Sequence, residues 1–269
     1  MDPLRIAVVG PGRAGGAVAL RARAVGHHIE AVVPGPSGSV PEGLSDAAIV
    51  ADGPLPPVDL VILSVPDDSI AIVSEALVGR LPSSAKPVVV HLSGLTSVEA
   101  LSALADAGCG TGGLHPLMTL PDAGTGSEAL AGSPAGISAS SPDAAEMIAG
   151  FAASLGMRPF ELDDGRRALY HAAASVAANM VTAVLGLSFD LFAGAGIDPA
   201  VSRPLVREAV DNCFDLGPGP ALTGPVARGD VGTVALQRSA VADLDPDLAS
   251  EFDSLLDLVR ARAARMQRR

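Results

Sequence analysis

Near its start, the chain alternates between short apolar runs and amphipathic segments, which is typical of parallel α/β proteins. The apolar run 5–9 leads through a glycine-rich turn into a helical pattern at 13–25, which Gly26 ends. Apolar runs at 58–66 and 88–92 are likewise each followed by a helical pattern. Because these runs contain few polar residues, they are typical of strands buried on both faces. The pattern therefore predicts an α/β fold with a doubly wound parallel Rossmann sheet.

Shorter elements complete this predicted sheet and its helices. We expect Asp67 or Asp68 to cap a helix at 69–78. We also expect Thr96 and Glu99 to form a capping box that opens the next helix. The other predicted strands are 28–33, 48–51, 113–116, 134–139 and 157–162, and the other predicted helix is 142–155, capped by Ser141.

Beyond residue 163 the strand patterns cease, and a long apolar helix begins. We therefore predict a dinucleotide-binding α/β domain at 1–163, followed by an all-α domain at 164–269. No charged residue stands between Arg167 and Asp190, a length that would also suit a membrane span. Because polar residues interrupt this stretch, we expect other helices to cover it, including those of a second subunit, rather than a membrane.

Four polar residues of this helix, His171, Ser175, Asn179 and Thr182, fall on one side of it. At about 100° per residue they lie within about 80° of one another. A buried polar group costs free energy unless it has a partner. The stripe therefore faces either a wet cleft beside a cofactor, which needs the fewest assumptions, or a buried network between subunits.

The turn at 10–15 reads Gly-Pro-Gly-Arg-Ala-Gly and joins the first strand to the first helix. The first glycine permits the tight turn, the second lets the backbone approach a diphosphate, and the third lets helix and strand pack closely. The diphosphate would lie at the helix N-terminus, where backbone N–H groups are unpaired. The alternative is a turn kept only for packing. The residues expected to hold the cofactor are Gly10, Pro11, Gly12, Arg13, Ala14, Gly15, Ser37, Val65, Pro66 and Ser93.

The end of the second strand bears on the choice between NADP and NAD. A dinucleotide fold normally places a ribose-binding carboxylate there, but this strand ends in Val33 and Pro34, and Glu30 lies too early. Arg13 and Ser37 could instead bind the 2′-phosphate of NADP. NADP is therefore favoured, and NAD stays open.

Composition excludes several function classes. A net charge of −12 without a basic face argues against nucleic acid as a partner. Two cysteines form neither a disulfide framework nor a metal site, and the apolar start is too short for a signal peptide, so we expect a cytoplasmic protein. Ala174 stands four residues after Tyr170, so the Tyr-x-x-x-Lys pair of short-chain dehydrogenases is absent.

The chain contains, in order, six segments that resemble those of one family: 10–15, 63–67, 91–94, 114–116, 170–179 and 222–230. The family is that of Rossmann-like oxidoreductases whose C-terminal half is a helical domain of originally unknown function, within the group with a 6-phosphogluconate-dehydrogenase-type C-terminal domain. The resemblance implies NADP binding, a homodimer built through the helical halves and, for some members, reduction of ketopantoate. Related hydroxyacid dehydrogenases carry Lys-x-x-x-Asn on the long helix, where this chain has Ser175 and Asn179.

We therefore expect an NADPH-dependent oxidoreductase that transfers a hydride to the carbonyl of a small 2-keto acid, with 2-dehydropantoate (ketopantoate) as the candidate substrate. Asn179 would donate a hydrogen bond to the developing oxyanion. His171 would donate the proton, because the pKa of free imidazole suits neutral pH, with His115 as second choice. Arg228, the one cation of its loop, would bind the substrate carboxylate or form a structural salt bridge. The residues expected to act on the substrate are His171, Asn179, Ser175, His115 and Arg228.

Two other functions stay open. One is an imine reductase resembling pyrroline-5-carboxylate reductase. The other is a non-catalytic NADP-binding sensor or scaffold, which the missing lysine makes reasonable. Turnover of NADPH with keto acids or cyclic imines would distinguish the three.

Overall fold

The computed structural model describes residues 1–82 and 86–266. They form two compact units, which divide between Ala178 and Asn179. The first unit contains an eight-stranded sheet of order β3-β2-β1-β4-β5-β6-β7-β8. The predicted doubly wound fold is confirmed, although β7 runs antiparallel to β6 because it begins at the edge where β6 ends. The strands are β1 Arg5–Val9, β2 His28–Val33, β3 Ala48–Ile49, β4 Leu60–Leu63, β5 Val88–His91, β6 Gly110–Pro116, β7 Pro134–Ala139 and β8 Arg158–Glu161.

Helices cover both faces of this sheet. Alternate side chains of β1 point to opposite layers: Ile6 and Val8 pack with α1 and α5, whereas Ala7 and Val9 pack with α2 and α3. The strand is buried on both sides, as its apolar run predicts. The helices of this unit, before the long helix, are α1 Arg13–Ala24, α2 Ile70–Val78, α3 Ser102–Asp106, α4 Ala123–Ala129 and α5 Pro142–Ser154.

Two of the predicted helix caps are wrong. Neither aspartate after β4 caps α2, because both belong to a 3-10 turn at Asp67–Ser69 that precedes it. Ser97, not Thr96, caps the segment after β5, where its hydroxyl accepts a hydrogen bond from the Glu99 N–H at 3.1 Å. The cap of α5 by Ser141 is confirmed.

The long apolar helix is interrupted. It consists of α6 (Arg167–Ser175), a π-helical segment at Val176–Met180 and α7 (Val181–Gly194). The two compact units divide within the π-helical segment, not at residue 163, because α6 packs on the first unit. A π-helix turns by a different angle per residue, so the predicted stripe of constant 100° spacing does not continue from Ser175 to Thr182.

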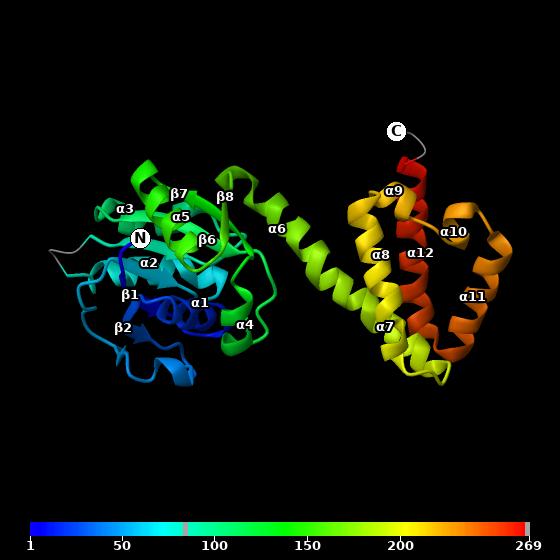
Figure 1. Cartoon of the computed structure of the whole chain (residues 1–269), viewed down its shortest axis with the longest axis horizontal. Coiled ribbons are helices and arrows are strands. Elements are labelled where there is room, and N and C mark those ends of the chain that lie inside the picture. Colours follow the sequence, from blue (N-terminus) through cyan, green and yellow to red (C-terminus); the bar gives the residue numbers. More distant parts are fainter. Residues whose placement is uncertain (83–85, 267–269) are drawn as a thin grey trace. The chain divides into compact units, whose positions relative to one another are not determined.

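The second unit is helical, and α12 packs against α7, α10 and α11 within it (Figure 1). Asp230 caps α11, because its carboxylate accepts a hydrogen bond from the Thr233 N–H at 3.0 Å. The further helices of this unit are α8 Arg203–Asp215, α9 Pro218–Ala221, α10 Pro225–Arg228, α11 Val231–Leu244 and α12 Pro246–Met266.

Apolar side chains of the second unit are mostly uncovered within this chain. Its buried apolar residues, among those described, are Leu187, Val234, Val241 and Leu256. The most apolar 18-residue part of the continuous stretch Asp164–Gly194 has a mean hydropathy of 1.7, and the stretch is long and apolar enough to span a membrane, but length and composition alone are weak evidence. Only 6% of its most apolar part is buried inside the chain.

Candidate functional site

The glycine turn between β1 and α1 is tightly packed at two of its glycines and open at the third. Gly10 has a φ of +80°, and a Cβ there would lie 2.5 Å from the Ser64 carbonyl oxygen. A Cβ at Gly15 would lie 2.7 Å from Cβ of Ser64. Gly12 is exposed, and a Cβ there would have no atom of the described chain within 4 Å. The turn therefore leaves space over Gly12 for a ligand.

The N-terminus of α1 has the donors that a diphosphate needs. Gly12 stands at its N-cap, no side chain caps the helix, and no acidic residue occupies its first turn. Arg13 and Ser37 are both exposed, after β1 and β2 respectively. The described chain thus fits a dinucleotide, with the helix N-terminus facing the diphosphate and a cation beside it. Pro11 and Ala14 complete the turn.

Four adjacent strands bring the predicted site residues to one edge of the sheet. The carboxyl ends of β1, β4, β5 and β6 carry the glycine turn, Val65, Ser93 and His115 in that order. Val65 packs beside Gly10, where its side chain would lie 3.3 Å from an added Cβ. His115 is three strand spacings, about 14 Å, from the glycine turn. Ligands of doubly wound sheets bind at this edge.

His115 and His171 meet over Gly94. A Cβ at Gly94 would lie 2.8 Å from Nε2 of His115 and 2.9 Å from Cδ2 of His171, and the two ring centroids are 6.3 Å apart. Both side chains are half-buried. The structure therefore brings together the two histidines that the sequence proposes as proton donors.

Tyr170 contacts this pair from the first turn of α6. Its hydroxyl lies 2.7 Å from Nδ1 of His115, and the two rings are perpendicular. Burial, the neighbouring His171 and the charge of Arg167 lower the pKa of His115 to about 4. The His115 ring is therefore neutral at neutral pH.

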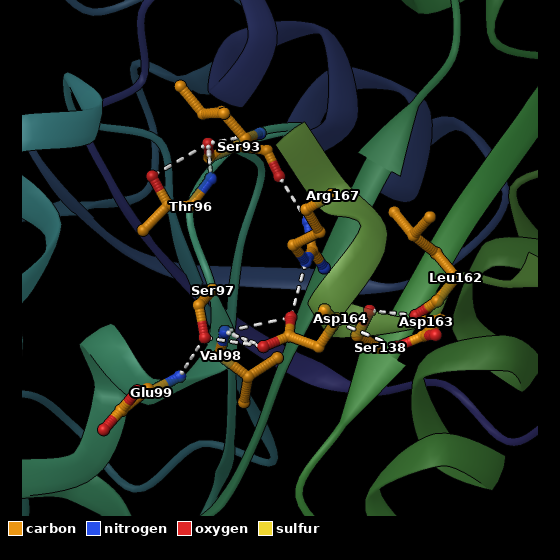
Figure 2. Close-up of polar contacts among 12 residues, drawn as sticks. Ser93, Thr96, Ser97, Val98, Glu99, Ser138, Leu162, Asp163, Asp164 and Arg167 are labelled. Carbon is orange, nitrogen blue, oxygen red and sulfur yellow. Dashed lines mark hydrogen bonds and ion pairs between the residues drawn. The ribbon is translucent and has the colours of Figure 1, made fainter. Parts of the chain in front are cut away.

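A buried ion pair fixes the beginning of α6 beside this site (Figure 2). The guanidinium of Arg167 donates hydrogen bonds to Asp164 at 2.6 Å and to the Ser93 carbonyl at 2.9 Å, and its side chain is 2% exposed. Asp164 in turn accepts hydrogen bonds from Ser97 and from the Val98 N–H. Burial would raise the pKa of Asp164, but these hydrogen bonds and the Arg167 charge lower it below its ordinary value. The cluster ties α6 to the loop after β5.

The hydroxyl of Ser93 is occupied by its own turn. It accepts hydrogen bonds from the N–H groups of Leu95 and Thr96 at 3.1 and 2.9 Å. Its backbone carbonyl accepts the hydrogen bond from Arg167. These contacts favour a structural role for Ser93 in the loop after β5, which also holds Gly94.

His91 is a buried titratable residue directly below this loop. It is 0% exposed, and neither ring nitrogen has a hydrogen-bond partner among the described residues. Burial, with the Arg167 charge as the second cause, lowers its pKa from 6.5 to about 4. At a pH between about 4 and 6.5, His91 is therefore neutral in the folded protein but protonated in the unfolded chain.

This difference predicts acid destabilisation. Between pH 6.5 and about 4, His91 is protonated in the unfolded chain but not in the folded protein. His91 alone should therefore lower the free energy of unfolding by up to about 3 kcal/mol as pH decreases. The His91→Leu variant should lose less stability over that range, because it has no imidazole to protonate. Urea unfolding at pH 7 and pH 5 measures both slopes. The exposed control His28→Gln should keep the wild-type slope; equal slopes in all three proteins would contradict the prediction.

The remaining predicted residues lie elsewhere. Ser175 is half-buried at the end of α6, one turn beyond His171. Asn179 and Arg228 belong to the second unit, and both are exposed. Arg228 ends α10 and forms no ion pair with the described residues. Their roles toward a substrate stay predictions.

Sequence reasoning missed three residues of the site: Tyr170, Arg167 and Asp164. Local sequence patterns give Tyr170 no role in the site, although it is the only tyrosine of the chain and neighbours His171. Asp164 stands at the first position of the predicted helical domain, where no local pattern assigns it a role. One signal could have indicated the buried ion pair: Arg167 is a charged residue that directly precedes a long apolar stretch.

Comparisons with known proteins agree with this geometry. Residues 133–258 match the family described as Domain of unknown function (DUF2520). The resemblance inferred from the sequence, a Rossmann-like fold with such a helical domain, is confirmed. No curated protein matches the chain.

Three solved structures share the fold over nearly the whole chain. A candidate NADP oxidoreductase from Bacteroides fragilis has a TM-score of 0.81 at 22% identity, covering 96% of this chain and 98% of that one. A Streptomyces aurantiacus imine reductase has a TM-score of 0.64 at 20% identity, covering 97% and 95%. The Plasmodium falciparum pyrroline carboxylate reductase with NADP bound has a TM-score of 0.61 at 12% identity, covering 98% and 99%. At these identities the likeness establishes the fold alone.

Proposed function

We propose that this chain, whose residues 133–258 carry the DUF2520 domain, is an NADPH-dependent oxidoreductase that reduces the carbonyl group of a small 2-keto acid. One observation carries the proposal: the open glycine turn and the imidazole of His115 lie on the same edge of one sheet. When bound, NADPH supplies the hydride. The candidate substrate is 2-dehydropantoate.

The choice of NADP over NAD rests on the end of β2. The strand ends at Val33, and no carboxylate follows it between 34 and 39 to bind a ribose hydroxyl. Arg13 is exposed at the first position of α1 and forms no ion pair with the described residues, so its charge is free for a 2′-phosphate. The NADP-bound reductase of similar fold supports this choice.

The protonation state of His115 favours a carbonyl over an imine. A neutral imidazole is a weak acid, so it can protonate only a strong base such as the alkoxide that forms when a carbonyl accepts a hydride. An imine is a much weaker base and has to be protonated before it accepts a hydride. An imidazole that is neutral at pH 7 is too weak an acid for that step. In this proposal His115 donates the proton through Nε2, and His171 lines the same space.

Turnover tests the proposal. The full-length protein is mixed with NADPH and with a panel of 2-keto acids and cyclic imines, and the loss of nicotinamide absorbance is followed. We expect turnover with a keto acid, 2-dehydropantoate included, and a preference for NADPH over NADH. Turnover only with cyclic imines would establish the imine reductase instead. Tight NADPH binding without turnover across a broad panel would favour the sensor or scaffold.

The proposal includes a homodimer formed through the helical unit. Large apolar side chains are exposed on several of its helices, among them Phe214 at 87%, Leu236 at 75% and Leu205 at 67%. An apolar groove of about 390 Å³ runs along α7 and α12 and includes Val184 and Phe252. Uncovered apolar surface of this extent is typical of subunit interfaces. A second copy of the helical unit supplies matching apolar helices.

Sedimentation at micromolar concentration measures this association. We expect a dimer for the wild type and a monomer for Val184→Asp, because a carboxylate would be buried in the apolar groove. Ile72→Asp is the control: Ile72 is 69% exposed on α2 of the first unit and should leave the dimer intact. A monomeric wild type would contradict the proposal. A monomer that binds lipid vesicles through the apolar helix would contradict it most strongly.

A further inference from the structure

Three neighbouring strands leave a gap beside His115 that Tyr170 fills. In the sheet, His115 of β6 pairs with Gly136 of β7, which in turn pairs with Phe160 of β8. Because Gly136 has no side chain, the Tyr170 hydroxyl fits above it, 3.3 Å from where its Cβ would lie. The Tyr170 ring lies between those of His115 and Phe160, with centroid distances of 5.5 and 6.1 Å. The hydroxyl lies 2.7 Å from Nδ1 of His115.

The hydrogen bond between these residues has one favoured direction. A neutral imidazole has one N–H donor and one acceptor nitrogen, and their assignment depends on its partners. A phenol is a much stronger acid than a neutral imidazole N–H, so the Tyr170 O–H donates to Nδ1 of His115. The proton of the ring then resides on Nε2. That atom has no hydrogen-bond partner among the described residues and, unlike the nitrogens of His91, is not sealed inside the protein.

Resting on the function proposed above, we propose that Tyr170 is the positioning residue of this site: its hydroxyl fixes the Nε2–H tautomer of His115 and replaces the proton that His115 delivers. As the Nε2 proton passes to the product oxygen, the Tyr170 hydroxyl proton passes to Nδ1. The imidazole stays neutral, and a tyrosinate remains until water reprotonates it. No imidazolate has to form, and the hydride and proton together complete the two-electron reduction.

The surrounding charges are compatible with this transfer. Burial raises the pKa of Tyr170, and the charge of Arg167 opposes that rise. The phenol therefore keeps its proton at neutral pH and stays available as a donor. The ionisable groups that influence the His115–Tyr170 pair are His171, Arg167 and Asp67.

The tautomer can be observed without cofactor or substrate. In ¹⁵N spectra of the full-length protein at pH 7, we expect His115 to show an unprotonated Nδ1 and a protonated Nε2. In Tyr170→Phe the fixed tautomer should give way to a mixture. Phe160→Leu is the matched control, because it removes the other aromatic neighbour of Tyr170 and leaves the hydroxyl, so the tautomer should persist. A protonated Nδ1 in the wild type, or an unchanged tautomer in Tyr170→Phe, would overturn the proposal.

The chain has one tyrosine and no tryptophan, so near-ultraviolet absorbance titration follows the ionisation of Tyr170 alone. We expect the pKa from this titration to coincide with the alkaline limb of kcat, and we expect that limb to vanish in Tyr170→Phe. In that variant kcat should fall about ten- to a hundredfold with little change in KM. An alkaline limb that persists in Tyr170→Phe would overturn the relay. If the tautomer and the titration behave as expected but no carbonyl compound turns over, the reductase function fails while the Tyr170–His115 pair stands.

Discussion

The His115→Ala variant should lose kcat by a factor of about 10² to 10⁴, because it removes the group that protonates the product oxygen. Its affinity for NADPH should stay near the wild-type value, since the glycine turn is three strands away. Initial rates with the best keto acid and NADPH binding by fluorescence measure the two effects separately. If the alanine variant folds poorly, His115→Asn can replace it, because asparagine keeps a polar side chain in this half-buried position.

The control for this experiment is His28→Ala, which removes an exposed histidine at the start of β2. It should leave kcat unchanged. His171→Ala tests the alternative proton donor. The proposal predicts a larger loss of kcat in His115→Ala than in His171→Ala. A loss of kcat confined to His171→Ala would show that His171 is the donor, as the sequence analysis ranked it. Full activity in His115→Ala would exclude the role proposed for it.

Arg167→Ala should destabilise the folded protein by about 3 kcal/mol, the lower end of the cost of breaking a buried ion pair by removing one partner. The guanidinium of Arg167 is 2% exposed, whereas Asp164 is 34% exposed, so water can solvate part of the carboxylate left behind. The variant also removes the hydrogen bond to the Ser93 carbonyl and leaves a cavity below Gly113. Equilibrium unfolding in urea at pH 7 measures the change.

The neighbouring residue offers a matched control for Arg167. Arg166 pairs with Asp163 at 3.4 Å, with side chains 78% and 65% exposed. Exposed pairs contribute little, so Arg166→Ala should change the free energy of unfolding by less than about 0.5 kcal/mol. Similar small effects in both variants would show that the Arg167–Asp164 pair does not fix α6.

Local patterns predicted most of the α/β unit. The buried strands and the glycine turn follow from apolar runs and from Gly10, whose positive φ few other residues tolerate. The caps after β4 and β5 could not be predicted reliably, because several Ser, Thr and Asp residues stand in each loop and packing decides which one reaches a free N–H. The antiparallel direction of β7 was missed for a similar reason, since its apolar pattern does not depend on strand direction.

The candidate site was less predictable than the fold. The histidines at 115 and 171 are 56 residues apart in numbering, and only the packing of α6 on the sheet brings them together over Gly94. The predicted polar stripe assumed a regular helix, and no sequence signal indicates the π-helical segment at Val176–Met180. Tyr170 gains its role from a gap at Gly136, which is a property of strand register. Such contacts depend on tertiary structure rather than on local sequence.

The account depends most on a dinucleotide bound at the glycine turn, and Gly12 allows this to be tested without disturbing the fold. Its φ of −74° lies outside the left-handed region that requires glycine, and a Cβ there meets no atom of the described chain within 4 Å. Gly15→Ala, by contrast, would place its Cβ against the Gly10 carbonyl and should weaken the fold itself.

The decisive measurement is the Kd for NADPH of the wild type and of Gly12→Ala, with thermal unfolding of both proteins recorded alongside. The account predicts measurable binding by the wild type, unchanged unfolding in the variant and a loss of affinity of about 1.4 kcal/mol or more, which is tenfold in Kd. Equal affinities in the two proteins, or a wild type that does not bind NADPH, would contradict it.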